Sequence, residues 1–511
     1  MRIYWLIKQH PSMNFSNQIV LVFATAFFML IMSINIVFAQ ETSYEIILDT
    51  YLDERPQKFV RNDNGGFVGL VLKAPPSDSV YIYNTYLYEV DSNGDTVSVK
   101  LVKQDTTVNF YNLYRINTVP KGYLLTGKGY SVNNNPSQPI VIIRRIDLGF
   151  NLVWERAFTF SQFNLEITLS SILELDNGDL LYACSPFFDP GMFILKLSSD
   201  GDSLDFESYH GNQAGKVIDL SYNHDSTQVL LSTMYAYYIN GDKLASVISI
   251  DENLDQISYN FYPSNFVFPY NVMYLNNESL LVGGSDRIPN SQTGMYDKMI
   301  CAYLLDTSFN IQHEIHLTNP DTNSRAAEVQ GLDFYYPNHI YLGGNHNMQN
   351  FTGYEPSWFY IAKLNDTLGL EYEKYIGGDY YYWLYSVTAS TDGGVLLAGT
   401  RNDYTTNYLQ RDGILLKLDS TGCITQNLEN LDLRISEAVV YPNPGIECIN
   451  VRTGLKDCNF ILFDSFGRIF MADPLTQHIS TFSTKSLPSG SYHYVVKQKK
   501  KIVISGTWIK N

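Results

Sequence analysis

Cysteine is scarce in this sequence. The 511 residues include only five cysteines, too few for a fold held together by disulfides. Cys184 and Cys301 lie within apolar segments, so we expect them to be buried as small hydrophobic residues. Cys448 and Cys458 flank a predicted hairpin and could be bridged in an oxidising compartment, whereas Cys423 has no evident partner. The sequence therefore leaves the cysteine pairing open.

Positive charge is also in short supply. The chain has 35 Lys and Arg against 52 Asp and Glu, which gives a formal net charge of -17. Nucleic acids and anionic membrane surfaces would repel so acidic a protein. We therefore predict no nucleic-acid partner.

The common catalytic and metal-binding motifs are missing as well. There is no zinc-protease helix motif, nucleophile elbow, phosphate-binding loop or dinucleotide fingerprint. His313 and His316 are three apart, which places them on opposite faces of a strand rather than together on a metal. Residues 91–95 and 200–202 resemble calcium loops, but the first lacks the glycine at loop position six and the distal bidentate glutamate of such loops, so we interpret both as turns. The sequence predicts no metal, no cofactor and no identifiable catalytic residue.

Only one apolar run is long enough to span a bilayer. It covers residues 19–38 and follows Arg2 and Lys8, and the triplet 37–39 places small residues one and three positions before Gln40. This pattern is typical of a cleaved export signal, here residues 1–39. The alternative is a retained membrane anchor. After signal removal we expect no transmembrane span.

Helical periodicity is nearly absent, and a repeated β-strand unit takes its place. In the clearest copy, residues 386–419, an alternating strand leads to a glycine turn, an apolar strand, a polar loop and a third strand that ends at Asp419. We identify seven copies, about 50 to 60 residues apart, a spacing typical of propeller blades. Their first turns lie at residues 63–66, 120–122, 176–179, 224–226, 276–278, 337–338 and 392–394.

The two ends of the repeat region complement each other. The first six copies carry a fourth strand, whereas the seventh stops after Gly422 without one. Residues 44–51 form a spare strand before the first copy. Pairing this strand with the last copy would close a ring and protect its open edges. We therefore predict an all-β fold in which residues 40–424 form a seven-bladed β-propeller. An open solenoid or a pair of sandwiches is the alternative.

The composition changes after a polar linker at residues 425–436. Residues 437–511 hold three separate motifs, in which proline enforces extended backbone and Asp, Gly and Pro form turns between alternating strands, as in a small β-sandwich. The motif residues are Tyr441, Pro442, Asn443 and Pro444, then Asp464, Gly467 and Arg468, then Pro488, Gly490 and Tyr492.

This tail resembles the carboxy-terminal type A sorting domain of type IX secretion. The resemblance implies contact with the type IX secretion machinery and passage through the periplasm to the outer cell surface or the medium. The repeat region is similar to repeats of secreted bacterial proteins that carry such a tail, which implies fold and location but no chemistry.

Aromatic residues are the one hint of a binding function. If the strand before each glycine turn is innermost, the loops between second and third strands and those between copies share one face of the disc. Exposed Tyr and Trp there would suit stacking on sugars or peptides. The candidate ligand-binding residues are Tyr235, Tyr237, Tyr238, Tyr354, Trp358, Tyr380, Tyr381, Tyr382 and Trp383.

Two functions therefore remain open. The first is a non-catalytic surface or secreted binding protein that recognises glycan or peptide through this aromatic face. The second is a hydrolase or lyase with carboxylates gathered at the central channel. The aromatic runs also have a purely structural interpretation, in which alternate members pack between the blades and bind no ligand.

Overall fold

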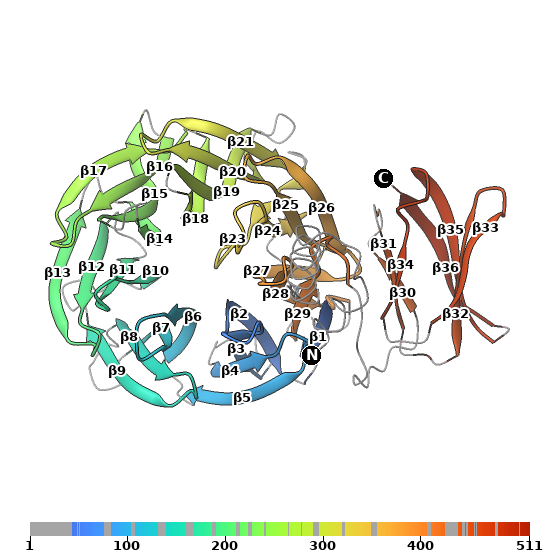
Figure 1. The fold of residues 1–511 in the computed structure, drawn as a ribbon, viewed down its shortest axis with the longest axis horizontal. Helices are drawn as coiled ribbons and strands as arrows, with labels where there is room; N and C mark the ends of the chain where they lie inside the picture. Colours follow the sequence, from blue (N-terminus) through green and yellow to red (C-terminus); the bar gives the residue numbers. More distant parts are fainter. Residues whose placement is uncertain are drawn as a thin grey trace, which may run out of the picture. The chain divides into compact units, whose positions relative to one another are not determined.

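A computed structural model gives the fold of the chain (Figure 1). The described residues are 43–510 apart from 49, 51, 76–82, 104–107, 131–138, 160–166, 187–190, 211–214, 223–226, 240–241, 264, 277, 290–295, 319–321, 349–354, 406–409, 425–437, 442–444, 446–447, 454, 456, 476–478 and 500. The predicted export signal, residues 1–39, lies outside them. No helix in the described part is long and apolar enough to cross a membrane.

Seven antiparallel sheets follow one another around a ring in the described part of the chain before residue 424 (Figure 1). The first strand of each sheet is innermost and its last strand is outermost. This arrangement is a β-propeller, as the sequence predicts. The first three sheets contain β2 (Asp53–Arg61), β3 (Phe67–Ala74), β4 (Asn84–Val90) and β5 (Thr96–Lys103); β6 (Val108–Ile116), β7 (Gly122–Tyr130), β8 (Pro139–Asp147) and β9 (Leu152–Thr159); and β10 (Ile167–Glu174), β11 (Leu180–Pro186), β12 (Gly191–Leu197) and β13 (Ser203–His210).

The fourth to seventh sheets follow the same order. In the sixth, two short segments, β22 and β23, pair with the same strand, β24, in place of a single inner strand. The strands are β14 (Lys216–Tyr222), β15 (Val229–Ile239), β16 (Asp242–Ile250) and β17 (Gln256–Phe261); β18 (Phe266–Asn276), β19 (Ser279–Pro289), β20 (Tyr296–Asp306) and β21 (Ile311–Leu317); β22 (Arg325–Ala326), β23 (Leu332–Phe334), β24 (Ile340–His346), β25 (Trp358–Leu364) and β26 (Leu370–Gly377); and β27 (Tyr381–Ala389), β28 (Val395–Asn402) and β29 (Asp412–Leu418).

The seventh sheet takes its outermost strand from the beginning of the described chain. Strand β1 (Tyr44–Leu48) pairs antiparallel with β29, with Tyr44 opposite Lys417 and Leu48 opposite Gly413. Tyr44 is 1% exposed and belongs to an apolar cluster that also contains residues of the first sheet. One short strand thus completes the last sheet and packs against the first.

The turn that follows the third strand is the most regular local feature of the repeats. Its first residue turns its side chain back onto the backbone: Asp306 Oδ1, for example, accepts the N–H groups of Ser308 and Asn310 at 2.8 and 2.9 Å. Three residues after this first residue, the backbone has a positive φ. These residues are Gly94 (95°), Phe150 (61°), Gly201 (81°), Leu254 (67°), Phe309 (65°), Leu368 (59°) and Gly422 (77°).

The core of the propeller lies between adjacent sheets. Leu181 and Ile194 of the third sheet pack with Leu231 and Ile248 of the fourth, and all four are nearly inaccessible to solvent. Because each sheet is apolar on both faces, it is stable only with a neighbour on either side. A closed ring gives every sheet two neighbours.

The tail forms two sheets around a core of its own, with Trp508, Phe460 and Ile449 fully buried. This agrees with the predicted sandwich. One sheet contains β30 (Ala438–Tyr441), β31 (Cys448–Thr453) and β34 (Ile479–Ser483); the other contains β32 (Cys458–Asp464), β33 (Ile469–Leu475), β35 (Gly490–Gln498) and β36 (Lys501–Lys510).

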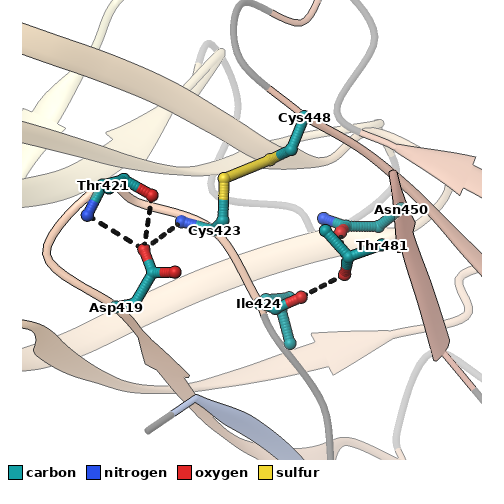
Figure 2. Close-up of a disulfide and its surroundings, with 7 residues drawn as sticks. All are labelled: Asp419, Thr421, Cys423, Ile424, Cys448, Asn450 and Thr481. Carbon is teal, nitrogen blue, oxygen red and sulfur yellow. Dashed lines mark hydrogen bonds between the residues drawn. A yellow bond between two sulfur atoms is a disulfide. The ribbon is translucent and has the colours of Figure 1, made fainter. Parts of the chain in front are cut away.

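The structure gives the cysteine pairing that the sequence leaves open. Cys423, which has no evident partner in the sequence, forms a disulfide with Cys448 (Figure 2). Cys458 is buried and takes part in no disulfide in the described part of the chain. The predicted Cys448–Cys458 hairpin does not form, because β31 pairs with β30 and β34 whereas β32 pairs with β33 and β35. Cys184 and Cys301 are free and fully buried, as expected.

Candidate functional site

The aromatic residues proposed from sequence are placed in very different surroundings. Tyr381 and Tyr382 are only 6% and 5% exposed. The Tyr382 ring packs edge-on against Phe359 at 5.2 Å, and its hydroxyl donates to Asp379 at 2.8 Å. Both tyrosines therefore contribute to the core rather than to an accessible face.

Other members of the aromatic set are partly accessible. Trp358, Tyr380 and Trp383 are half-buried. Trp383 lies on the innermost strand β27 and stacks on Tyr385 with ring centroids 6.3 Å apart. Tyr354 lies outside the described residues. Tyr235, Tyr237 and Tyr238 belong to β15, and the structure describes their backbone but not their side chains.

A second candidate site emerges from the innermost strands, where one position recurs in all seven sheets. Each such strand has a buried apolar residue that faces the second strand, for example Phe59 opposite Gly69 and Val272 opposite Val282. The residue just before it is polar or glycine in every sheet. We call these seven residues the axial ring: Lys58, Asn112, Ser171, Asp219, Asn271, Gly331 and Ser386.

Bulges in the inner strands accompany the axial ring. The pairing register shifts immediately before Asn112, Asp219 and Ser386. A bulge re-aims a side chain that would otherwise follow the regular alternation. The shifts thus allow polar residues inside strands whose other positions are largely apolar.

Hydrogen bonds within the axial ring tie three neighbouring sheets together at Asp219. Its Oδ1 accepts from Ser171 Oγ at 3.2 Å and from the Leu220 N–H at 3.0 Å. Its Oδ2 accepts from Asn271 Nδ2 at 3.5 Å and from the Val272 N–H at 3.1 Å. Burial raises the pKa of the Asp219 carboxyl, while Lys58, the two backbone N–H groups and the Ser171 hydroxyl act to lower it.

Lys58 differs from the rest of the axial ring. Its Nζ lies 4.0 Å from the centre of the Tyr114 ring, close enough for a cation–π contact. Among the described residues this ammonium has no hydrogen-bond acceptor and no carboxylate within ion-pair distance. Burial lowers the pKa of Lys58, and the charges of Asp219 and Asp333 oppose that shift.

Five residues of the axial ring, Lys58, Asn112, Ser171, Asp219 and Asn271, line open space. A cavity of about 630 Å³ is bordered by Lys58, Tyr114, Ser171, Asp219 and Asn271. A second cavity of about 250 Å³ shares Lys58 and Asp219 and extends to Asn112. The first is of a size that could hold a small ligand or a short segment of a polymer.

Asp333, the other carboxylate near Lys58, has a structural environment. It pairs with Arg61 at 2.7 Å and accepts the Ala389 N–H at 2.9 Å, linking the sixth sheet to the first and the seventh. Burial raises the pKa of its carboxyl, and Arg61 opposes that shift. Asp333 is 7% exposed.

Sequence reasoning missed the axial ring because its signal is spread over seven distant residues. The usable signal is a single polar residue just before the central apolar residue of each inner strand. It becomes visible only when the copies are aligned on that apolar residue, whereas our alignment relied on the glycine turns.

The described residues contain no group of three metal-ligating side chains. The acidic segments that resemble calcium loops are turns: Asp91 Oδ1 accepts the N–H groups of Asn93 and Asp95 at 2.8 and 2.9 Å. His316 instead contacts a buried carboxylate, with Nδ1 2.9 Å from Asp286 Oδ2.

The sorting motifs of the tail are turns and strand ends. Asp464 Oδ1 accepts the N–H groups of Phe466 and Arg468, and Gly467 has a φ of 81°. The Tyr492 hydroxyl donates to the Pro488 carbonyl at 2.8 Å, and β35 begins at Gly490. Tyr441 ends β30, while Pro442, Asn443 and Pro444 lie outside the described residues.

Known proteins resemble the two parts of the chain to different degrees. Residues 439–511 match the family described as the secretion system C-terminal sorting domain. A search of the curated proteins finds no match.

Several solved structures are similar to this chain at low identity. The AfRom2 CNH domain is 9% identical with a TM-score of 0.42, over 74% of this chain and 99% of that one. The Dos1 propeller is 11% identical with a TM-score of 0.39, over 81% and 93% of the two chains. Puromycin hydrolase is 12% identical with a TM-score of 0.39, over 71% and 52%.

The family match, the three motifs and the sandwich fold agree on the tail. A sorting domain of this kind engages the type IX secretion machinery and directs its protein to the cell surface or the extracellular space. The chain is therefore an exported β-propeller protein that carries a type IX secretion C-terminal sorting domain at residues 439–511.

Proposed function

We propose that this protein is a surface or secreted binding protein and that its propeller takes a ligand, glycan or peptide, in the axial cavity. The observation that carries the proposal is the Lys58 ammonium, which borders a cavity of about 630 Å³ and has no hydrogen-bond acceptor among the described residues. A partly buried ammonium is strongly stabilised by an acceptor. A ligand oxygen would supply one.

The rest of the cavity suits a polar ligand with an apolar face. Tyr114 offers a ring beside Lys58, and Asn271 lies on the same wall. Sugars and peptide groups combine carbonyl or hydroxyl oxygens with flat apolar surfaces. The oxygens could bond to Lys58 and Asn271, and the apolar surfaces could stack on the Tyr114 ring. From the aromatic set we retain Trp383 and Trp358 as further candidates, because each is partly accessible.

The test is a glycan and peptide array probed with residues 41–511, followed by titration of the strongest hit. We expect Lys58→Met to weaken binding at least tenfold, since a hydrogen bond from a charged group contributes about 1.5–3 kcal/mol. Lys121→Met is the matched control, because Lys121 lies on a turn with 46% of its side chain exposed. It should bind like the parent.

The aromatic residues are tested separately with Trp383→Ala. Weaker binding in this variant would extend the site along β27. Equal binding by the parent and the Lys58→Met variant would reject the axial site, whatever the behaviour of Trp383→Ala.

A hydrolase or lyase is the second candidate, favoured by two carboxylates with raised pKa values, Asp219 and Asp333, whose charges act on the same ammonium. Their hydrogen bonds support a structural role instead, because each already accepts backbone N–H groups. Incubating the array hit with the parent and with Asp219→Asn decides between the two. Products formed only by the parent would establish catalysis.

A further inference from the structure

The last turn of the propeller holds Cys423 in a fixed position. Asp419 Oδ1 accepts the N–H groups of Thr421 and Cys423, each at 2.9 Å, and the Thr421 hydroxyl at 2.7 Å (Figure 2). Gly422 supplies the left-handed residue of the turn, with a φ of 77°. Cys423 is 6% exposed, so its sulfur is part of the packed structure.

Cys448 is equally well held on the side of the sorting domain. It begins β31, which pairs with β30 on one side and β34 on the other, and it is 3% exposed. The two cysteines are joined with their Cα atoms 6.6 Å apart, within the usual range for a disulfide. The bond therefore connects two folded elements.

A hydrogen bond next to the disulfide joins the same two parts. The Thr481 hydroxyl on β34 donates to the Ile424 carbonyl, directly after Cys423 (Figure 2). Thr481 lies opposite Asn450 in the sheet, and their side chains also meet at 2.7 Å. The end of the propeller thus contacts two adjacent strands of the sorting domain.

The disulfide closes a loop around the linker. Cys423 and Cys448 are 25 positions apart, and the linker at residues 425–436 lies between them. A single cut anywhere in this loop opens it but leaves both sides joined through sulfur. Peptide cleavage and separation of the two parts are therefore different events.

We propose that the propeller remains covalently bound to its own sorting domain after the linker is cut, and that separation requires reduction of Cys423–Cys448. The reduction is a two-electron exchange. A dithiol attacks one sulfur to form a mixed disulfide, its second thiol displaces that bond, and the protein leaves with two thiols while the reductant becomes a disulfide. Linker cleavage in an oxidising compartment then yields a nicked, two-chain protein.

Peptide mapping tests the bond itself. Arg434 is the only Lys or Arg between the two cysteines, so trypsin separates residues 418–434, with Cys423, from residues 435–452, with Cys448. Cys458 falls in a third peptide, residues 457–468. In an unreduced digest we expect 418–434 linked to 435–452. A link between 435–452 and 457–468 would overturn the proposal.

A cleavable linker tests the consequence. Residues 427–432 of the full chain are replaced by the recognition sequence of a site-specific protease, and the exported protein is cut and run on a denaturing gel. We expect one band without reductant and two bands with dithiothreitol. Two bands without reductant would contradict the proposal.

Cysteine variants identify the bond responsible. Cys423→Ser and Cys448→Ser should each separate into two bands after cutting without reductant, because the denaturing gel removes every non-covalent contact. Cys458→Ser and Cys184→Ser are the matched controls and should stay as one band, since neither cysteine forms a disulfide among the described residues. Release in the Cys458→Ser variant but not in Cys423→Ser would assign the bond elsewhere and reject the inference.

Discussion

Two histidines show how opposite surroundings give opposite responses to pH. His346 packs against Tyr375 and Trp358, with ring centroids 4.7 and 5.6 Å away, and burial lowers its pKa to about 4. His316 has its Nδ1 2.9 Å from the buried carboxylate of Asp286, and this contact raises its pKa. The first is neutral in the folded protein under mildly acidic conditions, whereas the second gains a proton more readily.

Folding stability should follow these shifts with opposite signs. The contribution of neutral His346 is present above its unfolded pKa of about 6.5 and is lost as the pH falls towards 4. The contribution of charged His316 is present below about pH 6.5 and is lost as the pH rises through its folded pKa.

Between pH 7 and pH 4.5 the parent loses the stabilising contribution of neutral His346. Over this window we expect the difference in free energy of unfolding between the parent and His346→Gln to shrink by about 1–2 kcal/mol. The parent and His316→Gln should converge as the pH rises above 6.5. Urea unfolding of all three proteins at several pH values is the measurement. Parallel curves for His346→Gln and the parent would contradict the assignment of its pKa.

At the scale of the element, the closing strand depends on one aromatic residue. The Tyr44 ring is 1% exposed and lies so close to Gly94 that a β-carbon there would clash with it. Its hydroxyl is buried and has no hydrogen-bond partner in the described residues. The ring therefore stabilises β1 while the hydroxyl opposes that effect.

This division predicts different results for two substitutions. Tyr44→Ala should destabilise the protein by about 3–5 kcal/mol, as for other large buried aromatic residues. Tyr44→Phe removes only the unpartnered hydroxyl and should be neutral or stabilising by up to about 1 kcal/mol. Urea denaturation of both variants measures the change in free energy of unfolding. A decrease of more than 1 kcal/mol in Tyr44→Phe would show that the hydroxyl has a hydrogen-bond partner.

How far the sequence predicts these elements depends on how local the signal is. The closure by β1 follows from counting strands, because a spare strand and an unfinished copy are both visible in the sequence. The left-handed backbone of Phe150, Leu254 and Leu368 is not visible in the sequence, because apolar residues carry no turn signal. Burial of these side chains offsets the backbone strain. The glycine turns in the clearer copies are easier to recognise.

The candidate site was less accessible to prediction than the fold. Tyr381 and Tyr382 were proposed as binding residues because they were expected in an exposed loop, yet both belong to β27 and are buried, and Tyr382 packs against Phe359 of the sixth sheet. Lys58 and Asp219 come together only when the ring closes, from positions far apart in the sequence. The Cys423–Cys448 bond likewise joins two domains across a linker that has no strand pattern.

At the scale of the whole molecule, the tail determines where the propeller works. Deleting residues 439–511 should leave the protein in the periplasm, because the domain that engages the type IX machinery is then lost. Cell fractionation of the deletion strain checks this. Gly467→Val is a milder companion variant that strains the motif turn at a φ of 81° and should reduce export partially. Normal surface delivery of the deletion protein would refute the assigned address.

The partnership between β1 and β29 also sets when the propeller can finish folding. A ribosome makes Tyr44 before Leu418, so the earliest strand waits for the latest one while several sheets have already been synthesised. During that interval β1 has no partner strand, and the apolar residues of the first sheet that pack against the seventh are open to foreign strands. We therefore expect the nascent chain to need a holding chaperone until its final sheet is synthesised.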